Sequence, residues 1–390
     1  MKDLKKILFI ILTVFLVSGT NNSKDIRVNL NGAISYAEEQ SNSIIIESSN
    51  KTEKSSNISD LSMEENEMSS TQYNLFPIKS NGKWGYIDVQ GKVVIEPQFI
   101  WASEFTDDVA GVKIGEKISG IIDKKGRILS IHNYNYIHAF QNGVALMTSF
   151  DDEDCKMRNY GIINKEGKEI VSPRYAQIAI EDHKFYDGLA RIYGVGFIDR
   201  DGNVVIKDQP DYNIFNFHDE RAVITKYARD IDKHGYIDLK GKLVIPMEYL
   251  VAASFSDGLA CVSLDHKKYG YIDKDGKLVI GFNFDRLNDF SDGLAEFYQN
   301  GKYGYIDKKG NVVIKPTFEY AESFSEGLAA VYTNGKWGYI DKSGKIVIEA
   351  LGYSPEKFKN GLAKVTIKSD ERSIITGYIN KKGVLLWVNN

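Results

Sequence analysis

Short apolar runs separated by polar turn residues recur along most of this chain. In residues 328–350, "LAAVYTNGKWGYIDKSGKIVIEA", three apolar runs are divided by Asn334-Gly335 and by the four residues from Asp341 to Gly344. An Asn-Gly pair favours a two-residue hairpin because both of its positions adopt positive φ. Asp followed three residues later by Gly is typical of a type I turn that ends in a left-handed residue. The pattern therefore predicts a three-stranded antiparallel meander.

Two further features of this unit concern its edges. The connecting segment "KPTFEYAESFSEG" places Phe318, Ala321 and Phe324 at helical spacing, which predicts one short helical turn. The third apolar run, such as "NVVI" from Asn311, does not alternate with polar residues and predicts a strand that is buried on both faces. A single meander cannot cover both faces, so one copy is not expected to fold alone.

The unit repeats nine times. The glycine of "GYID" and its equivalents recurs at intervals of 34 to 41 residues, and the second residue after it is always isoleucine. The glycines are Gly85, Gly120, Gly161, Gly196, Gly235, Gly270, Gly304, Gly338 and Gly377. A second landmark, "FSDGLA" or "FSEGLA", begins at Phe255, Phe290 and Phe324. Periods of this length are typical of solenoids, propellers and linear arrays.

The ends of the repeat region bear on whether the array closes into a ring. The region begins with a first strand at residues 74–82 and finishes with a third strand at residues 383–388. Closed propellers commonly complete one blade with strands from both termini, and they usually have four to eight blades. The expected fold is therefore all-β, an open and curved solenoid-like array of about nine meanders; a β-propeller is the alternative.

The repeated motif resembles a known family. "NGKWGYID", "NGKYGYID" and "NGKWGYID" begin at Asn81, Asn300 and Asn334, each followed by a β-branched strand and then by the Phe-x-x-Gly-Leu-Ala motif. These motifs resemble the WG repeat family of bacterial proteins over residues 73–390. The resemblance implies binding or scaffolding repeats and supplies no catalytic residues. The Trp-Gly pair itself is present at Trp84 and Trp337.

The region before the repeats differs from them in composition. Three lysines precede the apolar run "ILFIILTVFLV", which is followed by small residues up to Gly19, and this order is typical of a signal peptide. The run is much shorter than a membrane-spanning helix, which needs about 20 residues. Residues 1–19 are thus predicted to be a signal peptide that is cleaved near Gly19. Ala37 is a less favoured alternative position for the cleavage. Residues 20–72, rich in Ser, Asn and Glu, are predicted to be a disordered acidic spacer. The expected location is extracellular, either free or non-covalently attached to the cell wall, with no stable membrane insertion after cleavage.

Charge and cysteine content exclude several classes of function. The net charge is −4, so there is no basic field to attract nucleic acid. Cys155 and Cys261 match no metal-binding spacing and are interpreted as small apolar core residues. The recurring aspartates, such as Asp341, suit the first position of a turn better than a calcium ladder, since Asn164 and Asn380 replace Asp in two copies. No cofactor is expected.

Aromatic residues supply the candidate binding site. Alternate residues of a strand share a face, so the residue before the landmark glycine and the residue after it point the same way. The candidates are Trp84, Tyr86, Tyr236, Tyr271, Tyr305, Trp337, Tyr339 and Tyr378. They could form a row of platforms for sugar rings, or they could fill the space between repeats, because tyrosine packs well on half-buried strands.

These observations favour a secreted, non-catalytic binding protein whose partner is an unidentified protein. A carbohydrate-binding or wall-binding module that uses the aromatic row is the first alternative. The second alternative is an enzyme with a site at a repeat junction. The sequence has no H-E-x-x-H or G-x-S-x-G motif, and none of its six histidines belongs to a recognisable catalytic pattern.

Overall fold

The structure is a computed structural model that describes residues 74–150, 158–176, 184–192, 194–226, 232–349, 353–369 and 374–389. The predicted signal peptide and spacer lie outside the described residues. Strands and turns account for the regular structure of the described ranges, which contain no α-helix, so the all-β prediction is confirmed. Within these ranges no helix has the length and apolar character needed to cross a membrane.

The described strands form nine antiparallel sheets, which we call blades 1 to 9 in chain order. Blade 1 contains β1 (Phe76–Ser80), β2 (Lys83–Ile87) and β3 (Val93–Phe99). Blade 2 contains β4 (Trp101–Ala102), β5 (Val109–Gly115), β6 (Ile118–Asp123) and β7 (Ile128–His132). Blade 3 contains β8 (Tyr136–Ile137), β9 (Val144–Phe150), β10 (Arg158–Asn164) and β11 (Glu169–Ala176). Blade 4 contains β12 (Ala190–Ile192), β13 (Gly196–Ile198) and β14 (Val204–Lys207). Blade 5 contains β15 (Tyr212–Ile214), β16 (Arg221–Lys226), β17 (Lys233–Asp238) and β18 (Leu243–Tyr249). Blade 6 contains β19 (Val251–Ala252), β20 (Leu259–Ser263), β21 (Tyr269–Asp273) and β22 (Leu278–Phe284). Blade 7 contains β23 (Arg286–Leu287), β24 (Leu294–Gln299), β25 (Lys302–Asp307) and β26 (Val312–Phe318). Blade 8 contains β27 (Tyr320–Ala321), β28 (Leu328–Thr333), β29 (Lys336–Asp341) and β30 (Ile346–Glu349). Blade 9 contains β31 (Tyr353–Pro355), β32 (Leu362–Ser369), β33 (Ile374–Asn380) and β34 (Leu385–Val388).

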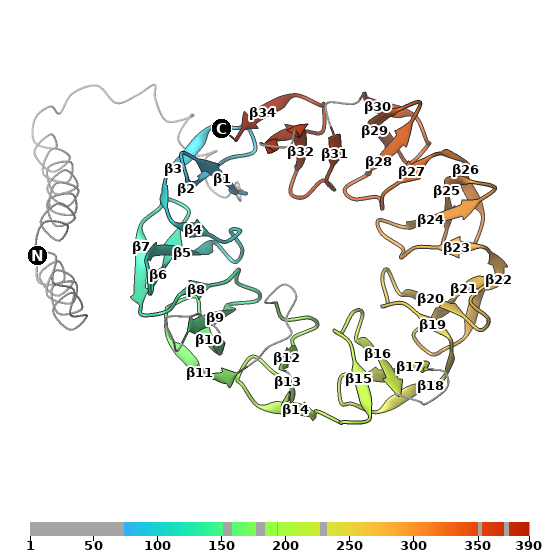
Figure 1. The fold of residues 1–390 in the computed structure, drawn as a ribbon, viewed down its shortest axis with the longest axis horizontal. Coiled ribbons are helices and arrows are strands. Elements are labelled where there is room, and N and C mark those ends of the chain that lie inside the picture. The colour runs from blue at the N-terminus through green and yellow to red at the C-terminus, as the bar shows by residue number, and fades with distance from the viewer. Residues whose placement is uncertain are drawn as a thin grey trace, which may run out of the picture. The chain divides into compact units, whose positions relative to one another are not determined.

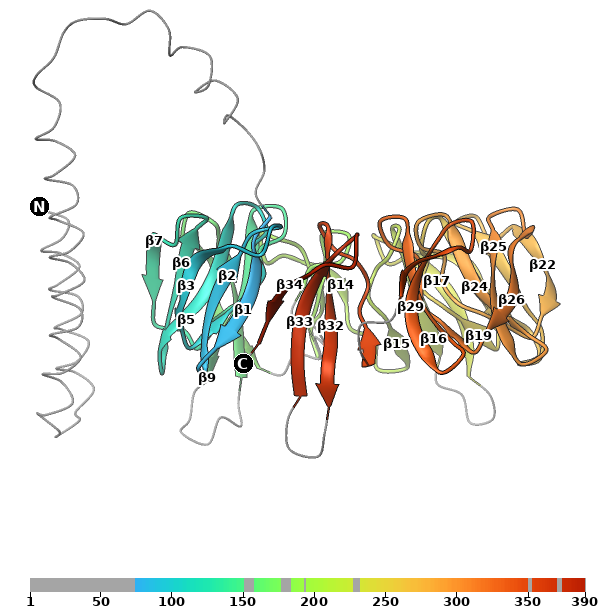
Figure 2. The ribbon, with the colours of Figure 1, turned by 90° about the horizontal axis from the view of Figure 1, so that it is seen from above.

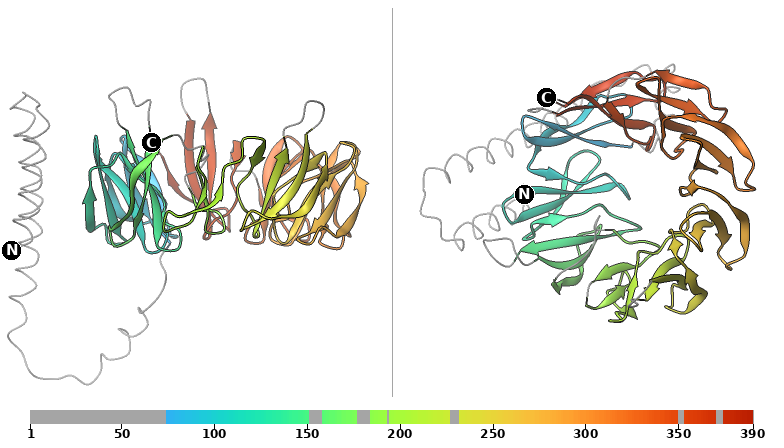
Figure 3. Two further views of the ribbon diagram at one scale, coloured as in Figure 1. Left: turned by 90° about the horizontal axis from the view of Figure 1, so that it is seen from below. Right: turned by 45° about the vertical axis from the view of Figure 1, so that its right-hand side comes forward.

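The nine described sheets stand around a central axis and form a closed β-propeller, seen from one end in Figure 1 and from the side in Figures 2 and 3. The alternative prediction of a propeller is thus confirmed, and the main prediction of an open array is wrong. Among the described strands, closure does not combine strands from opposite ends of the repeat region in one blade, since blade 9 consists of β31 to β34. Instead, Phe76, Ile78 and Ile87 of blade 1 pack against Leu362 of blade 9. Closure therefore uses side-chain burial between blade 9 and blade 1, and the shared blade that the sequence argument assumed is not formed by the described strands.

Each predicted meander is present, and most blades add a short innermost strand that the sequence did not predict. In blade 8 the ladder runs β27-β28-β29-β30. The predicted helical turn is wrong because Tyr320 and Ala321 pair with β28 as strand β27. Main-chain bonds from Glu319 N to Tyr332 O (3.0 Å) and from Glu322 N to Ala330 O (2.8 Å) keep this segment extended. The helical spacing of its apolar residues reflects three separate contacts with the core.

The turn chemistry follows the prediction. Asn334 and Gly335 have φ of 52° and 74°, as a two-residue hairpin requires. The Asp341 carboxylate accepts hydrogen bonds from the amides of Ser343 (2.9 Å) and Lys345 (3.1 Å). Gly344 has a φ of 86°, and a Cβ there would lie 3.1 Å from the Ile314 side chain of the preceding blade. Glycine is therefore required both by the turn and by the contact between blades.

The third strand of each meander is the outer edge of its blade, so the prediction that it is buried on both faces is wrong. In β26, Val312 and Val313 are 51% and 45% exposed, whereas Ile314 is 6% exposed. Only the isoleucine points toward the next blade, where it lies beneath Gly344. The aliphatic pairs in these strands are exposed because each strand lies at the outer edge of its blade.

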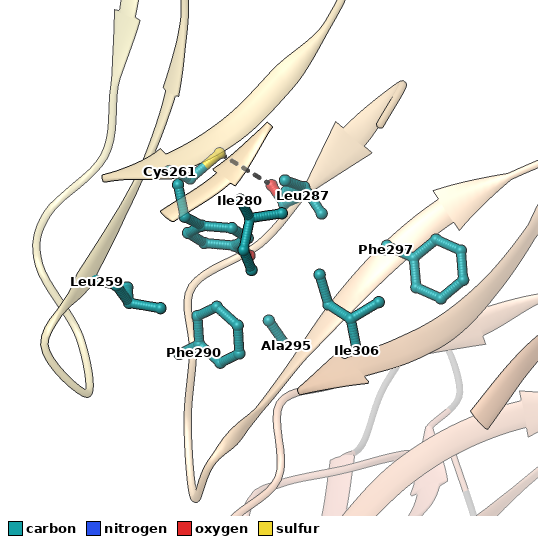
Figure 4. Packing of buried hydrophobic residues seen from close by; sticks show 9 residues of the cluster. Leu259, Cys261, Ile280, Leu287, Phe290, Ala295, Phe297 and Ile306 are labelled. Carbon is teal, nitrogen blue, oxygen red and sulfur yellow. Dashed lines mark hydrogen bonds between the residues drawn. The ribbon is translucent and has the colours of Figure 1, made fainter. Parts of the chain in front are cut away.

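Cys261 agrees with its predicted structural role. It is buried in the cluster between blades 6 and 7, where its thiol lies 3.8 Å from the main-chain oxygen of Leu287 (Figure 4). Burial raises the pKa of this thiol to about 12. Cys155 lies outside the described residues.

Candidate binding site: an aromatic row on blades 7 and 8

The predicted candidate aromatics fall into two groups that the structure places at different depths. The buried group consists of Tyr86, Tyr236, Tyr271, Tyr305 and Tyr339. Tyr305 is representative: its ring lies 4.8 Å from that of Phe324 in the next blade, and its hydroxyl donates to the main-chain oxygen of Glu322 at 2.8 Å. Desolvation raises the pKa of each of these phenols. A ring contact and a tyrosine hydrogen bond thus join each of these five blades to the next one.

The buried tyrosines therefore fill the space between blades and offer no ring face to a ligand. Equivalent hydroxyl bonds run from Tyr86 to Ser103, from Tyr236 to Ala253, from Tyr271 to Asn288 and from Tyr339 to Glu356. Tyr378 differs because it is half-buried and its hydroxyl donates to Pro77 of blade 1 at 3.0 Å. Burial raises its pKa to about 12.

The two tryptophans of the predicted set are half-buried rather than buried. Trp84 lies on the same side of β2 as Tyr86, as predicted, and packs at the margin of the cluster between blades 1 and 2. The Lys79 ammonium lies 5.8 Å from its ring centre. Trp337 occupies the equivalent position in blade 8, where it takes part in a larger group of rings.

That group is a continuous line of aromatic rings on blades 7 and 8, which we call the aromatic row. Neighbouring ring centres are 4.9, 5.8, 6.4 and 5.4 Å apart along the line. In spatial order its members are Tyr298, Tyr303, Tyr320, Trp337 and Tyr332. Tyr320 is 58% exposed and the other four rings are half-buried. The row is therefore partly accessible to solvent, most of all at Tyr320.

Strand register explains why these rings meet. Tyr298 pairs with Tyr303 across the β24-β25 hairpin, and Tyr332 pairs with Trp337 across the β28-β29 hairpin. Tyr320, on the innermost strand β27, pairs with Tyr332 and lies close enough to Tyr303 to connect the two hairpins. Directly opposite residues in an antiparallel pair have neighbouring side chains. The row thus lies at the Asn-Gly end of the strands, away from the Asp-x-x-Gly turns.

Polar groups flank the row. The Lys302 ammonium and the Glu319 carboxylate form an ion pair at 3.1 Å, and each side chain is 41% exposed. Each residue precedes a member of the row, Tyr303 and Tyr320 respectively. Half-exposed Tyr and Trp rings with charged neighbours suit a surface that stacks on a partner and hydrogen-bonds to it.

Sequence reasoning found Trp337 but missed the four tyrosines of the row. The pairing of Tyr298 with Tyr303 and of Tyr332 with Trp337 follows from the Asn-Gly hairpins and could have been found by counting outward from each turn. Tyr320 had no such signal, because its segment was predicted to be helical.

The repeated aspartates hold turns. In the described copies the first carboxylate oxygen accepts amide hydrogen bonds from the second and fourth following residues, as Asp307 does from Lys309 and Asn311 at 2.9 Å each. Among the described residues, no group of three or more His, Cys, Asp or Glu side chains is arranged to hold a metal ion.

Two charged side chains are buried among the described residues, Arg191 and Glu296. Arg191 in β12 forms an ion pair with Asp208 at 3.0 Å and also donates to the main-chain oxygen of Ile214 in the next blade. Glu296 in β24 is 1% exposed, and both of its carboxyl oxygens are buried without a hydrogen-bond partner. This unpartnered carboxyl lies two residues before Tyr298, the first residue of the aromatic row.

Comparisons with known proteins agree with the repeat structure. The family model described as "WG containing repeat" matches seven segments: residues 84–117, 120–148, 160–193, 235–267, 269–303, 303–337 and 337–369. These matches confirm the resemblance predicted from the motifs. No curated protein matches the sequence.

Solved structures resemble the fold at low sequence identity. A crystal structure described as that of the eukaryotic initiation factor matches with a TM-score of 0.59 and 12% identity, over 82% of this chain and 96% of that one. BamB from Moraxella catarrhalis matches with a TM-score of 0.36 and 8% identity, over 82% of this chain and 92% of that one. At such identity, the first of these similarities concerns the fold alone.

Proposed function

Because this chain belongs to the WG containing repeat family and folds as a β-propeller, we propose that it is a secreted, non-catalytic binding protein that holds a partner protein at the cell surface. Secretion is inferred from the apolar run of residues 7–17, which follows three lysines. Propellers have a rigid frame on which side chains of several blades can contact one ligand.

The observation that carries this proposal is the aromatic row. Tyr and Trp are enriched among the residues that contribute most to protein interfaces, because they provide a large contact area and lose little conformational entropy. Tyr320 is the most exposed member of the row, with 58% of its surface accessible. It also lies between the rings of blade 7 and those of blade 8, so a partner that contacts it touches both blades.

The proposal is tested by placing a photo-crosslinking residue at position 320 and exposing the mature chain to an extract of cell-surface proteins. One discrete crosslinked protein is expected from position 320 and none from position 215, where Phe215 is 46% exposed but lies outside the row. Affinity for that protein should fall on the order of tenfold or more in Tyr320→Ala and remain unchanged in Phe215→Ala. Equal labelling at both positions would contradict the proposal.

A second candidate is a module that binds cell-wall polysaccharide, and the linear order of the half-exposed rings favours it. Sugar rings stack on aromatic faces, and the spacing of the row suits an extended ligand better than a compact one. Sedimentation with purified, protein-free peptidoglycan distinguishes the two candidates. Binding that depends on Tyr320 and survives removal of all protein from the wall would favour the polysaccharide.

A further inference from the structure

Glu296 occupies a repeat position that faces the next blade. Aligned through its partner on the following strand, this position holds Val223 in blade 5, Cys261 in blade 6 and Ala330 in blade 8. These three side chains are small or apolar, and all are buried. Glu296 is therefore a carboxyl group in a position that other blades use for packing.

The geometry of the equivalent cysteine indicates what Glu296 faces. Cys261 points at the main-chain oxygen of Leu287 in the innermost strand of blade 7, as Figure 4 shows. The corresponding residue in blade 8 is Ala321 of β27. A main-chain oxygen only accepts hydrogen bonds, so it suits a protonated carboxyl and repels a carboxylate.

The groups around Glu296 compensate an ionised form only in part. Tyr271 and Tyr305 are the nearest phenols, but their hydroxyls are donated to Asn288 and Glu322. The main-chain amide of Glu296 itself and the Ser323 hydroxyl both lower the pKa of Glu296, but neither makes a hydrogen bond of good geometry to its carboxyl oxygens.

The remaining charged groups act in opposite directions. Lys357 lowers the pKa of Glu296, and Glu322 raises it. Burial outweighs these effects and raises the pKa of Glu296 to about 7.

Glu296 is connected directly to the aromatic row. It shares one side of β24 with Tyr298, and its cross-strand partner Tyr305 shares one side of β25 with Tyr303. Tyr305 and Tyr303 belong to the cluster where blade 7 meets blade 8, and Tyr303 contacts Tyr320 across that junction. A change in the distance between the two blades at Glu296 therefore changes the spacing of the row.

We propose that Glu296 is a proton-controlled switch of the aromatic row: when protonated it holds blades 7 and 8 together, and when ionised it loosens their junction and separates Tyr303 from Tyr320. The regulatory meaning of this switch rests on the proposed function, because it assumes that the row is the binding surface. The conformational effect does not depend on any ligand.

The test is hydrogen exchange of the full mature chain at pH 5.5 and pH 8.5, corrected for the intrinsic exchange rates. Opening that hydrates Glu296 returns its pKa from about 7 to the ordinary value of 4.5. Protection of residues 319–331 should therefore fall on the order of 30-fold between the two pH values. Residues 251–263, whose junction carries Val223 at the equivalent position, should show no such change and serve as the internal control.

Variants decide whether Glu296 is responsible. Glu296→Gln and Glu296→Leu should remove the pH dependence, while Glu322→Gln, which changes an exposed neighbouring carboxylate, should retain it. A wild-type chain without the pH dependence, or a Glu296→Gln chain that keeps it, overturns the proposal. Crosslinking from position 320 is then repeated at both pH values with the same surface-protein extract. If position 320 gives no crosslink at either pH, the proposed function is refuted but the switch is not. The exchange experiment measures the switch without a partner.

Discussion

The junction between blades 7 and 8 and the seam between blades 9 and 1 show two ways to join neighbouring sheets. At the first, Tyr305 is fully buried, contacts Phe324 and donates to the innermost segment of the next blade. At the seam, the equivalent Tyr378 is only half-buried, and the described part of blade 1, β1 to β3, includes no innermost strand that covers it. Tyr378 instead packs 5.8 Å from Phe76 and donates to Pro77.

The seam is bridged at the inner side of the ring by a contact that skips blade 1. Lys359 of blade 9 forms an ion pair with Glu104, which follows the innermost strand of blade 2. The comparison indicates that the junction between blades 7 and 8 takes part of its stability from the innermost strand β27, which the next repeat supplies. At the seam the described residues include no equivalent strand in blade 1, so we expect the seam to be the weaker of the two regions.

The largest expected effect comes from removing the buried ring at the internal junction. Tyr305→Ala deletes an aromatic core side chain and its hydrogen bond, which should destabilise the protein by about 3–5 kcal/mol. Denaturant unfolding, followed by tryptophan fluorescence, measures the loss. Phe215→Ala, a substitution of an exposed aromatic residue, is the control and should have little effect.

The next largest effect concerns the charge at the same junction. The folded-state pKa of Glu296, about 7, exceeds the ordinary value of 4.5, so the folded chain binds the proton more tightly than the unfolded chain. Stability therefore falls as pH rises from about 4.5 to 7 and then levels off. Glu296→Gln should remove this loss and stabilise the protein at pH 8 by up to roughly 3 kcal/mol, with little change at pH 4. Unfolding midpoints of both chains across this pH range are the measurement; parallel curves would contradict the assignment.

A smaller effect is expected at the seam. Tyr378→Ala removes a half-buried ring and one hydrogen bond, which should cost about 2 kcal/mol, less than the same substitution of Tyr305. Hydrogen exchange should show the loss in β1 and β33 before other strands. Equal destabilisation by the two substitutions would mean that the seam is as strong as an internal junction.

The two regions also differ in how far the sequence predicts them. The strands and turns of blades 7 and 8 follow from the Asn-Gly and Asp-x-x-Gly signals, since local turn chemistry determines them. The seam could not be predicted in this way, because the contact of Phe76 with Tyr378 joins residues at opposite ends of the repeat region. The candidate site is likewise predicted only in part. Trp337 belongs to a local sequence motif, whereas the position of Tyr320 depends on the short strand β27, which has no sequence pattern of its own.

The smallest effect is expected from the ion pair at the seam. Both side chains are largely exposed, with 60% of Lys359 and 45% of Glu104 accessible, so water and salt screen the attraction. Lys359→Ala should destabilise the chain by at most about 1 kcal/mol, and the difference should vanish at high ionic strength. The Lys302–Glu319 pair of blades 7 and 8 is similarly exposed, and Lys302→Ala is its matched control. If exchange in β1 increases in Lys359→Ala but not in Lys302→Ala at low salt, the ion pair contributes to ring closure specifically. Equal behaviour of the two variants would mean that the ion pair makes no specific contribution to ring closure.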